Sequence, residues 1–201
     1  NFTLFAQAVS KAEISPTLSA AEANITAFVP TDAAFDHLAQ RLKWANGSAM
    51  ITALPKETLR SILDYHLLAG LKQSSDLISA GSTQETFFKK NTVAQTLKLN
   101  FTDGIHITDA ATTISHVITP NIVASNGLIH SIDRVLIPPG VFNLVQTISI
   151  IPNLTKLSTL LGSGKLANPE LDINGFISGS TGYTIFAPTD TAFDGLKSDL
   201  T

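Results

Sequence analysis

Two aspartates occur in nearly the same surroundings and are the first candidates for chemistry. Asp32 lies within "ITAFVPTDAAFDHL" at residues 25–38, and Asp190 lies within "YTIFAPTDTAFDGL" at residues 183–196. Two carboxylates can share general acid–base catalysis, because one can donate a proton while the other accepts one. Each aspartate also stands at the predicted start of a helix, where such side chains cap bare N–H groups. We therefore predict a structural role for two matching triplets: Pro30, Thr31 and Asp32, and Pro188, Thr189 and Asp190.

Three histidines lie in or beside apolar segments and are candidate metal ligands. His66 falls on the apolar side of a predicted helix, His130 on a predicted strand, and His116 beside an apolar stretch. A metal site needs a further convergent ligand, and no short pattern such as His-x-x-x-His is present. A buried, neutral imidazole with a hydrogen-bond partner is the commoner role. The sequence therefore predicts neither a metal site nor a cofactor.

The sequence lacks the usual arrangements for nucleophilic or phosphoryl-transfer catalysis. Ser163 lies in "GSG", which is not the five-residue turn that carries the serine of many hydrolases. No G-x-x-x-x-G-K loop is present to bind phosphates. The chain has no cysteine, which excludes thiol catalysis and thiolate metal sites. We predict that the protein is not an enzyme.

Composition narrows the class of protein further. With 201 residues, 44% of them hydrophobic and 14% charged, the chain can bury a core and differs from disordered segments. The net charge is -3 and the densest basic pair is Lys89-Lys90, which argues against a nucleic-acid partner. No run of about eighteen apolar residues is present, so no transmembrane segment is predicted. Because the sequence begins with Asn1, we expect a mature or trimmed chain.

Asn-x-Ser/Thr triplets give the strongest signal about the compartment. Five occur in the chain, and this density favours a glycoprotein of the secretory pathway over chance triplets in a Ser/Thr-rich sequence. We therefore expect an extracellular or cell-surface protein. The predicted N-glycosylation sites are Asn1, Asn24, Asn46, Asn100 and Asn153.

Helices are expected mainly in the first third of the chain. Apolar residues at helical spacing predict a helix over residues 2–14. A strand ends at Pro30, which lacks an N–H group, and a further helix follows it. The clearest helix lies within residues 54–70, where Gly70 is the expected stop. In that helix we expect Tyr65 to lie on a different side from His66 and to be partly exposed.

Strands are expected after the helices. Alternating residues on both sides of Asp103-Gly104 predict one hairpin, and Asn126-Gly127 marks a second. "LIHSIDRVLI" at residues 128–137 is apolar on both faces and is predicted to form a central strand, which Pro138-Pro139 ends. Helices followed by antiparallel strands indicate an α+β domain.

The repeated letters predict how the chain is divided. Besides the duplicated Pro-Thr-Asp stretch, the segment that begins at Asn1 resembles the one at Asn153. The spacing between copies is the size of a whole domain. We expect a first domain over residues 1–139, a linker or helix start over 140–152, and the front of a truncated second domain over 153–201. The natural chain is expected to continue for on the order of eighty residues.

Three stretches, in order, resemble a known family. "FVPTDAAF", "DYHLL" and "NGLIHSIDRVLIPP" are similar to the signature stretches of fasciclin-like domains. The resemblance implies a wedge-shaped β-sheet with flanking helices, in tandem domains. It also implies a role in adhesion, with partners among matrix, cell-wall or cell-surface proteins or glycans. A glycolipid anchor outside this chain would fit that resemblance.

The resemblance also points to candidate partner-binding residues. A Tyr-His pair and an Asp-Ile pair are implicated in integrin binding by animal relatives, and they correspond here to Tyr65, His66, Asn121 and Ile122. Asn121 lacks the carboxylate that an integrin metal site would bind, which argues against integrin as the partner.

The main hypothesis is therefore a non-enzymatic adhesion or wall-matrix module. Weak surface contacts would be multiplied by tandem domains, because linking two modules raises their effective concentration. Two alternatives remain open. One is a structural subunit or assembly factor of a larger complex. The other is a carrier of a small apolar ligand, bound in a pocket between the sheet and the helices.

Overall fold

The structure is a computed structural model that describes residues 1–162 and 184–199. The chain divides into two compact units, Asn1–Val141 and Phe142–Thr201. Ser163 lies outside the described residues.

Unit 1 contains a seven-stranded sheet in which chain order and spatial order differ. The spatial order is β2-β1-β7-β6-β5-β4-β3, and only β1 and β7 run parallel. Strands β2 and β3, at the two ends of this order, also contact each other, which requires a curved sheet. The strands are β1 Ile25–Pro30, β2 Leu67–Ala69, β3 Thr83–Lys90, β4 Val93–Asn100, β5 His106–Thr108, β6 Ile114–Ala124 and β7 Gly127–Ile132.

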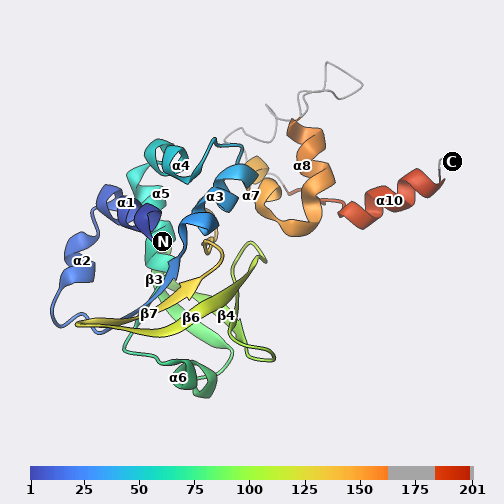
Figure 1. The fold of residues 1–201 in the computed structure, drawn as a ribbon. Coiled ribbons are helices and arrows are strands. Elements are labelled where there is room, and N and C mark those ends of the chain that lie inside the picture. The colour runs from blue at the N-terminus through green and yellow to red at the C-terminus, as the bar shows by residue number, and fades with distance from the viewer. Residues whose placement is uncertain (163–183, 200–201) are drawn as a thin grey trace. The chain divides into compact units, whose positions relative to one another are not determined.

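Helices gather at one end of this sheet. Helix α1 packs against α3, α4 and α5, whereas α6 lies at the far end of the unit (Figure 1). The helices of unit 1 are α1 Thr3–Ala12, α2 Ser15–Ser19, α3 Asp32–Arg41, α4 Gly47–Ala53, α5 Lys56–Tyr65 and α6 Ser74–Ser79. The predicted α+β class, a sheet with flanking helices, is confirmed.

The main core of unit 1 lies between α5, α6 and the sheet. Phe28 of β1, Tyr65 of α5 and Leu77 of α6 are each almost completely buried in it. The rings of Tyr65 and Phe88 meet edge to face at 6.2 Å. This packing connects the helical end to the strands that follow it in the chain.

The predicted hairpins are confirmed, but the predicted helix over residues 54–70 is too long. Strands β4 and β5 pair on either side of Asp103-Gly104, and β6 and β7 pair on either side of the turn at Asn126. Helix α5 ends at Tyr65, and residues 67–69 form β2 against β1 instead. The backbone N–H of His66 still bonds to the Leu63 carbonyl, but its own carbonyl accepts from Phe28 of β1. Pairing with the sheet therefore replaces the last helical turn.

The predicted strand over residues 128–137 is also too long. Strand β7 ends at Ile132, and residues 133–137 leave the sheet. The reason lies in their backbone N–H groups. Those of Leu136 and Ile137 bond to the side chains of His66 and Asp109 rather than to a neighbouring strand. Side chains elsewhere in the fold thus determine the course of this apolar segment.

Unit 2 is mainly helical in its described part. Its elements are α7 Leu144–Ile150, the 3-10 helix η1 Pro152–Leu154, α8 Thr155–Gly162 and α10 Asp190–Asp199. Ile148, Leu154 and Leu161 form a small core, against which Ile185 and Ala187 pack. The described residues of this unit contain no strand.

Candidate functional site

Asp32, the first aspartate of the duplicated motif, stabilises the start of α1. Asp32 Oδ1 accepts from the backbone N–H of Leu4 at 2.8 Å, and Asp32 Oδ2 accepts from the Thr3 hydroxyl at 2.6 Å. Thr31, not Asp32, caps α3, because the Thr31 hydroxyl accepts from the N–H of Ala34 at 3.3 Å. Slight burial raises the pKa of Asp32, but the bonds from Thr3 and Leu4 outweigh it and leave that pKa below its ordinary value.

Asp190, the second aspartate of the duplicated motif, makes the corresponding contacts in unit 2. Asp190 Oδ1 accepts from the backbone N–H of Lys156 at 2.8 Å, and Asp190 Oδ2 accepts from the Thr155 hydroxyl at 2.6 Å. The Thr189 hydroxyl accepts from the N–H of Ala192 at 3.4 Å, as Thr31 does in unit 1. Both carboxylates are thus engaged with a helix start in their own unit.

His66 is fully buried and bonded at both ring nitrogens. Its Nε2 lies 3.0 Å from the backbone N–H of Leu136 and must accept that hydrogen. Its Nδ1 therefore carries the proton and donates to the Ile62 carbonyl at 2.7 Å. Burial lowers the pKa of His66 to about 4, so the ring is neutral at physiological pH. These contacts join α5 to the segment after β7.

Tyr65 is also in the interior, contrary to the expectation that it is partly exposed. Its side chain is 1% exposed, and its hydroxyl donates to the Thr96 carbonyl of β4 at 2.9 Å. Because α5 packs against β3, the side of the helix that was expected to face solvent faces the strands. In this structure neither member of the Tyr-His pair reaches the surface.

Asn121 and Ile122 lie on the surface of β6. The Asn121 side chain accepts from the Ser74 N–H at 2.9 Å and donates to the Ser74 hydroxyl at 2.8 Å. Its backbone has φ 61, a left-handed conformation that asparagine tolerates. Ile122 is 36% exposed. Of the four candidate partner-binding residues, only these two are accessible to a partner.

His130 and Asn121 belong to one short chain of hydrogen bonds. The backbone N–H of Asn121 lies 3.3 Å from His130 Nδ1, so Nε2 carries the proton and donates to the Lys72 carbonyl at 2.9 Å. His130 is completely buried, and burial lowers its pKa. Like His66, it connects backbone segments.

Asp109 is a buried carboxylate that the sequence analysis missed. It accepts from three backbone N–H groups, those of Ala111 at 2.9 Å, Thr113 at 2.8 Å and Ile137 at 2.9 Å. Burial raises its pKa to about 6, although these bonds act to lower it. The first two bonds close a turn between β5 and β6, which an aspartate at the head of a short loop could have indicated.

The remaining polar cluster lies on the surface and does not form a metal site. The Asp133 carboxylate accepts from the backbone N–H of His116 at 2.7 Å and lies 2.9 Å from the His116 ring. The His116 and His106 rings meet edge to face with centroids 4.7 Å apart. Among the residues that the structure describes, no group of three or more histidine, aspartate or glutamate side chains is placed to hold a metal ion.

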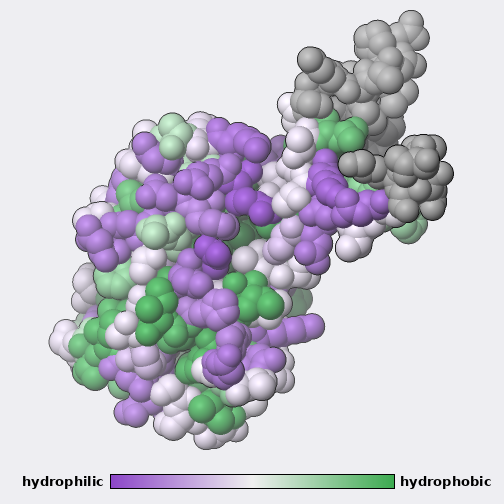
Figure 2. Space-filling model, turned by 45° about the vertical axis from the view of Figure 1, so that its right-hand side comes forward, coloured by the Kyte–Doolittle hydropathy of each residue, from purple (hydrophilic) through white to green (hydrophobic). Residues whose placement is uncertain are grey.

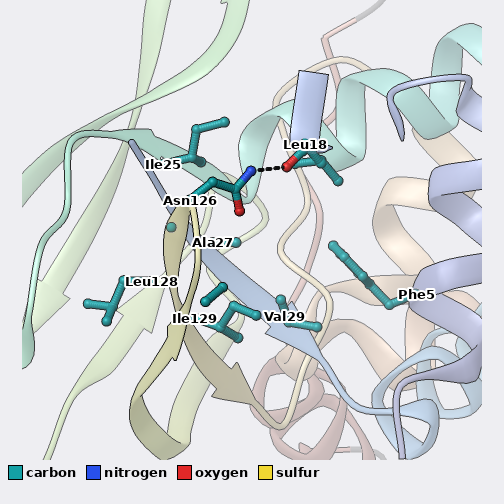
Figure 3. Close-up of a pocket in the computed structure, with 10 residues that line it drawn as sticks. Phe5, Leu18, Ile25, Ala27, Val29, Asn126, Leu128 and Ile129 are labelled. Carbon is teal, nitrogen blue, oxygen red and sulfur yellow. Dashed lines mark hydrogen bonds between the residues drawn. The ribbon is translucent and has the colours of Figure 1, made fainter. Parts of the chain in front are cut away.

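An apolar hollow of about 130 Å³ lies on the face of the sheet next to α1 and α2 (Figure 3). We call it the apolar hollow. It is lined by Phe5, Leu18, Ile25, Ala27, Val29, Ala124, Asn126, Gly127, Leu128 and Ile129. No catalytic group lines it.

The surface of unit 1 offers apolar contact area as well. Figure 2 shows apolar surface mainly over the sheet-bearing part of this unit, with polar surface over the helical end. Ile118 and Val123 of β6 are 56% and 81% exposed. Exposed apolar side chains of this kind can contribute to a contact surface, although single exposed apolar residues are also common on proteins.

The five sequon asparagines are all exposed. Two of them precede a threonine, Thr3 or Thr155, whose hydroxyl donates to the repeated aspartate. The side-chain oxygen of Asn46 caps α4 by accepting from the backbone N–H of Ala49 at 2.8 Å. The threonines of the sequons at Asn1 and Asn153 therefore also have a structural role, because each bonds to the aspartate that holds the start of a helix.

Similarity to known proteins shows the family of this chain. The model of the Fasciclin domain matches residues 1–138. The chain belongs to the fasciclin-domain family. It is 24% identical to the fasciclin-like arabinogalactan protein elcF of Phaeosphaeria nodorum over 184 residues, which are 89% of this chain and 53% of that protein. It is 32% identical to the protein sll1483 of Synechocystis over 140 residues, which are 69% of this chain and 68% of that protein.

A solved structure agrees with the fold. The FAS1 domain pair of the insect cell adhesion molecule Fasciclin I matches with a TM-score of 0.50 at 16% identity, over 98% of this chain and 62% of that one. The chain spans about half the length of its arabinogalactan-protein relative. Within residues 1–162 and 184–199, no helix has the length and apolar character needed to span a bilayer.

Proposed function

We propose that this fasciclin-domain protein is a non-enzymatic adhesion or wall-matrix module that acts through its outer surface. The observation that supports this proposal is that the candidate reactive side chains are occupied by hydrogen bonds within the fold. Asp32, Asp109 and Asp190 bind backbone N–H groups, and His66 and Tyr65 are buried and bonded. Side chains committed in this way contribute to a rigid scaffold. Contacts with a partner would then be made by exposed residues on the outer surface.

The same proposal places the protein outside the cell. Exposure of Asn1, Asn24, Asn46, Asn100 and Asn153 is compatible with N-glycans at these positions. The partner class we propose is a matrix, cell-wall or cell-surface protein or glycan, with attachment through a glycolipid anchor elsewhere as one arrangement. Digestion of the secreted protein with a glycosidase should lower its mass by whole glycans. An unchanged mass would contradict the glycoprotein part.

We further propose that unit 2 represents the front of a second fasciclin-like domain, with the divisions at 139 and 153 expected from the sequence. This proposal is supported by Asp190, which repeats in unit 2 the contacts of Asp32, here with Thr155 and Lys156. The exposure of Phe186 is a second, independent observation. Phe186 is 93% exposed, whereas its counterpart Phe28, on a strand that lies between β2 and β7 in the sheet, is completely buried in the core of unit 1. Two such domains on one chain would strengthen weak contacts.

Adhesion can be tested with coated beads. Beads that carry the glycosylated protein are applied to intact cells and to an extracellular-matrix preparation, and retention is counted after washing. We expect retention well above that of beads coated with the heat-unfolded protein, because the contacts need the folded surface. Equal retention of the two bead types would contradict the proposed function.

One alternative function has an observation in its favour. The exposed side chains of Ile118 and Val123 would suit a subunit interface in a larger complex. A partner that co-purifies at fixed stoichiometry from the secreting cells would support this alternative. The carrier alternative is not favoured, since the apolar hollow is smaller than the roughly 300–1,000 Å³ of typical ligand pockets.

A further inference from the structure

We infer that neutral His130 holds a surface bulge of β6 in place, and that acid releases this bulge through protonation of the ring. The bulge carries Asn121, next to Ile122, and these are the two candidate partner-binding residues that lie on the surface. The inference rests on the proposed adhesive function where it treats this bulge as a contact surface. It adds a way in which that contact would be regulated.

The bulge arises because β6 has one residue more than β7 between two paired positions. Pro120 and Asn121 of β6 both lie opposite His130 of β7. Proline has no N–H group to donate to a neighbouring strand, and Asn121 has φ 61, a left-handed conformation that persists where other contacts hold it. A bulge leaves its extra residue outside the regular ladder. The shape of β6 here therefore depends on contacts from side chains.

Two such contacts meet at Asn121. Its backbone N–H bonds to Nδ1 of His130 at 3.3 Å. Its side chain accepts from the N–H of Ser74 at 2.9 Å and donates to the Ser74 hydroxyl at 2.8 Å. Ser74 begins α6, a six-residue helix in which only Leu77 is buried, at the end of unit 1 away from the other helices (Figure 1). The bulge and the start of α6 are thus fastened to each other.

His130 can hold the bulge only as a neutral ring. Because Nδ1 accepts from Asn121, the proton lies on Nε2, which donates to the Lys72 carbonyl at 2.9 Å. In the charged ring both nitrogens carry a hydrogen, so Nδ1–H would face the N–H of Asn121. The bond to Lys72 survives protonation, whereas the bond to Asn121 becomes a contact between two donors. Protonation therefore acts on the bulge.

The surroundings of the ring determine the direction of the response. His130 is completely buried, and its ring centroid lies 5.5 Å from that of Phe28. Burial lowers the pKa of His130 from its ordinary value of 6.5, and the bond to the Lys72 carbonyl opposes this shift. The bulge is therefore held fully above pH 6.5, and its release increases as the pH falls from 6.5 towards the lowered pKa.

Other ionisable side chains on the surrounding elements have partners of their own. Strand β1 carries none, and β6 carries only His116, which is paired with a carboxylate. In the segment that runs into α6, Lys72 Nζ and the Asp76 carboxylate bond to neighbouring groups. His66, which precedes β2, is bonded at both ring nitrogens. The acid response of the bulge is therefore assigned to His130.

The test measures amide hydrogen exchange in the full chain by NMR between about pH 7.5 and about pH 5, corrected for intrinsic exchange. We expect protection at Asn121 and Ser74 to fall about fivefold or more in acid, because the released ring takes up a proton more readily than the buried one. Both amides should be less protected than that of Phe28, which bonds to the His66 carbonyl and reports unfolding of the sheet. Equal protection of all three, or no fall at Asn121 and Ser74, would overturn the inference.

A variant without the titrating ring provides the comparison. His130→Gln keeps a side chain that can accept one bond and donate another, and we expect its protection at Asn121 and Ser74 to change less than about twofold over the same range. The matched control His116→Gln makes the same change at an exposed histidine of β6 and should keep the response of the original chain. An acid response that persists in folded His130→Gln would overturn the inference.

A second variant covers the case in which His130→Gln does not fold. Asn121→Gly keeps the backbone N–H and suits the left-handed conformation, but it lacks the side-chain bonds to Ser74. We expect Ser74 to be unprotected at both ends of the pH range, while the amide of residue 121 still loses protection in acid. An amide of residue 121 that no longer responds to pH would contradict the role of His130.

The bead assay, run at the same two pH values, separates this inference from the proposed function. We expect retention of the original chain to fall in acid and that of His130→Gln to fall less. If the original chain is retained equally at both pH values, adhesion stands and the regulatory inference is wrong. If it is retained at neither, the adhesive function fails, and amide exchange still decides whether His130 holds the bulge.

Discussion

The pH dependence of folding should contain a contribution from His66 whose sign follows from its surroundings. The side chain is fully buried, and its Nε2 must accept the N–H of Leu136. Protonation of the ring breaks this bond and places a positive charge in the core. Burial accordingly lowers the pKa of His66 from its ordinary value of 6.5 to about 4. The stability that neutral His66 contributes is therefore complete above pH 6.5 and is lost as the pH falls towards 4.

The size of this contribution can be worked out from the pKa. At about 1.4 kcal/mol per pKa unit, the lowered pKa corresponds to about 3 kcal/mol of unfolding free energy. Other buried groups also contribute to the pH dependence of folding. The lowered pKa of His130 adds to the loss in acid, whereas the pKa of Asp109, raised to about 6, favours the folded state as the pH falls. A variant that lacks only the His66 ring isolates its share.

The measurement compares the original chain with His66→Gln by urea unfolding, followed by circular dichroism, at about pH 7 and about pH 4.5. We expect His66→Gln to be the less stable protein at pH 7, because the Leu136 amide loses an acceptor or regains a poorer one. The gap between the two proteins should shrink by about 2–3 kcal/mol at the lower pH, where the original histidine must charge or unfold. A gap of the same size at both pH values would refute the assignment of His66 as a buried neutral group.

Three further predictions follow from packing and hydrogen bonding. Phe28→Ala should cost about 3–5 kcal/mol of unfolding free energy, whereas Phe186→Ala should cost less than about 0.5 kcal/mol; similar costs in thermal unfolding would contradict the exposure of Phe186. Asp109→Ala should cost at least about 2–3 kcal/mol in urea unfolding, because three backbone N–H groups lose their acceptor, and a cost below about 0.5 kcal/mol would show that the carboxylate does not hold them. Asp32→Ala should cost about 1–2 kcal/mol and speed hydrogen exchange in the first turn of α1. Exchange at Leu4 that stays as slow as in the original chain would argue against this contact.

Local sequence patterns were sufficient to predict those elements whose structure depends mainly on their own residues. Apolar spacing predicted α1, turn residues predicted both hairpins, and the helix start after Pro30 was visible from its capping residues. The class and the family could be predicted for the same reason, since the signature stretches are short and continuous in the chain.

Contacts between distant segments were not visible in the sequence. Leu67–Ala69 continue the apolar pattern of a helix, but pairing with β1 makes them a strand. The surroundings of Tyr65 depend on β3 and β4, which follow much later in the chain. Asp32 shows the same limit: its position at a helix start was clear, but its bonds reach a different helix 28 residues earlier. The apolar hollow likewise combines α1, α2, β1 and β7, and no local pattern marks it.

The most direct test of the account is the bead-retention assay repeated with Tyr65→Phe. This change removes only a buried hydroxyl that bonds to Thr96 and leaves the outer surface as it is. We expect the folded variant to be retained on cells and matrix as strongly as the original chain, and both to exceed the heat-unfolded protein. Retention that is lost in folded Tyr65→Phe would contradict the claim that adhesion is made by the exterior of this scaffold.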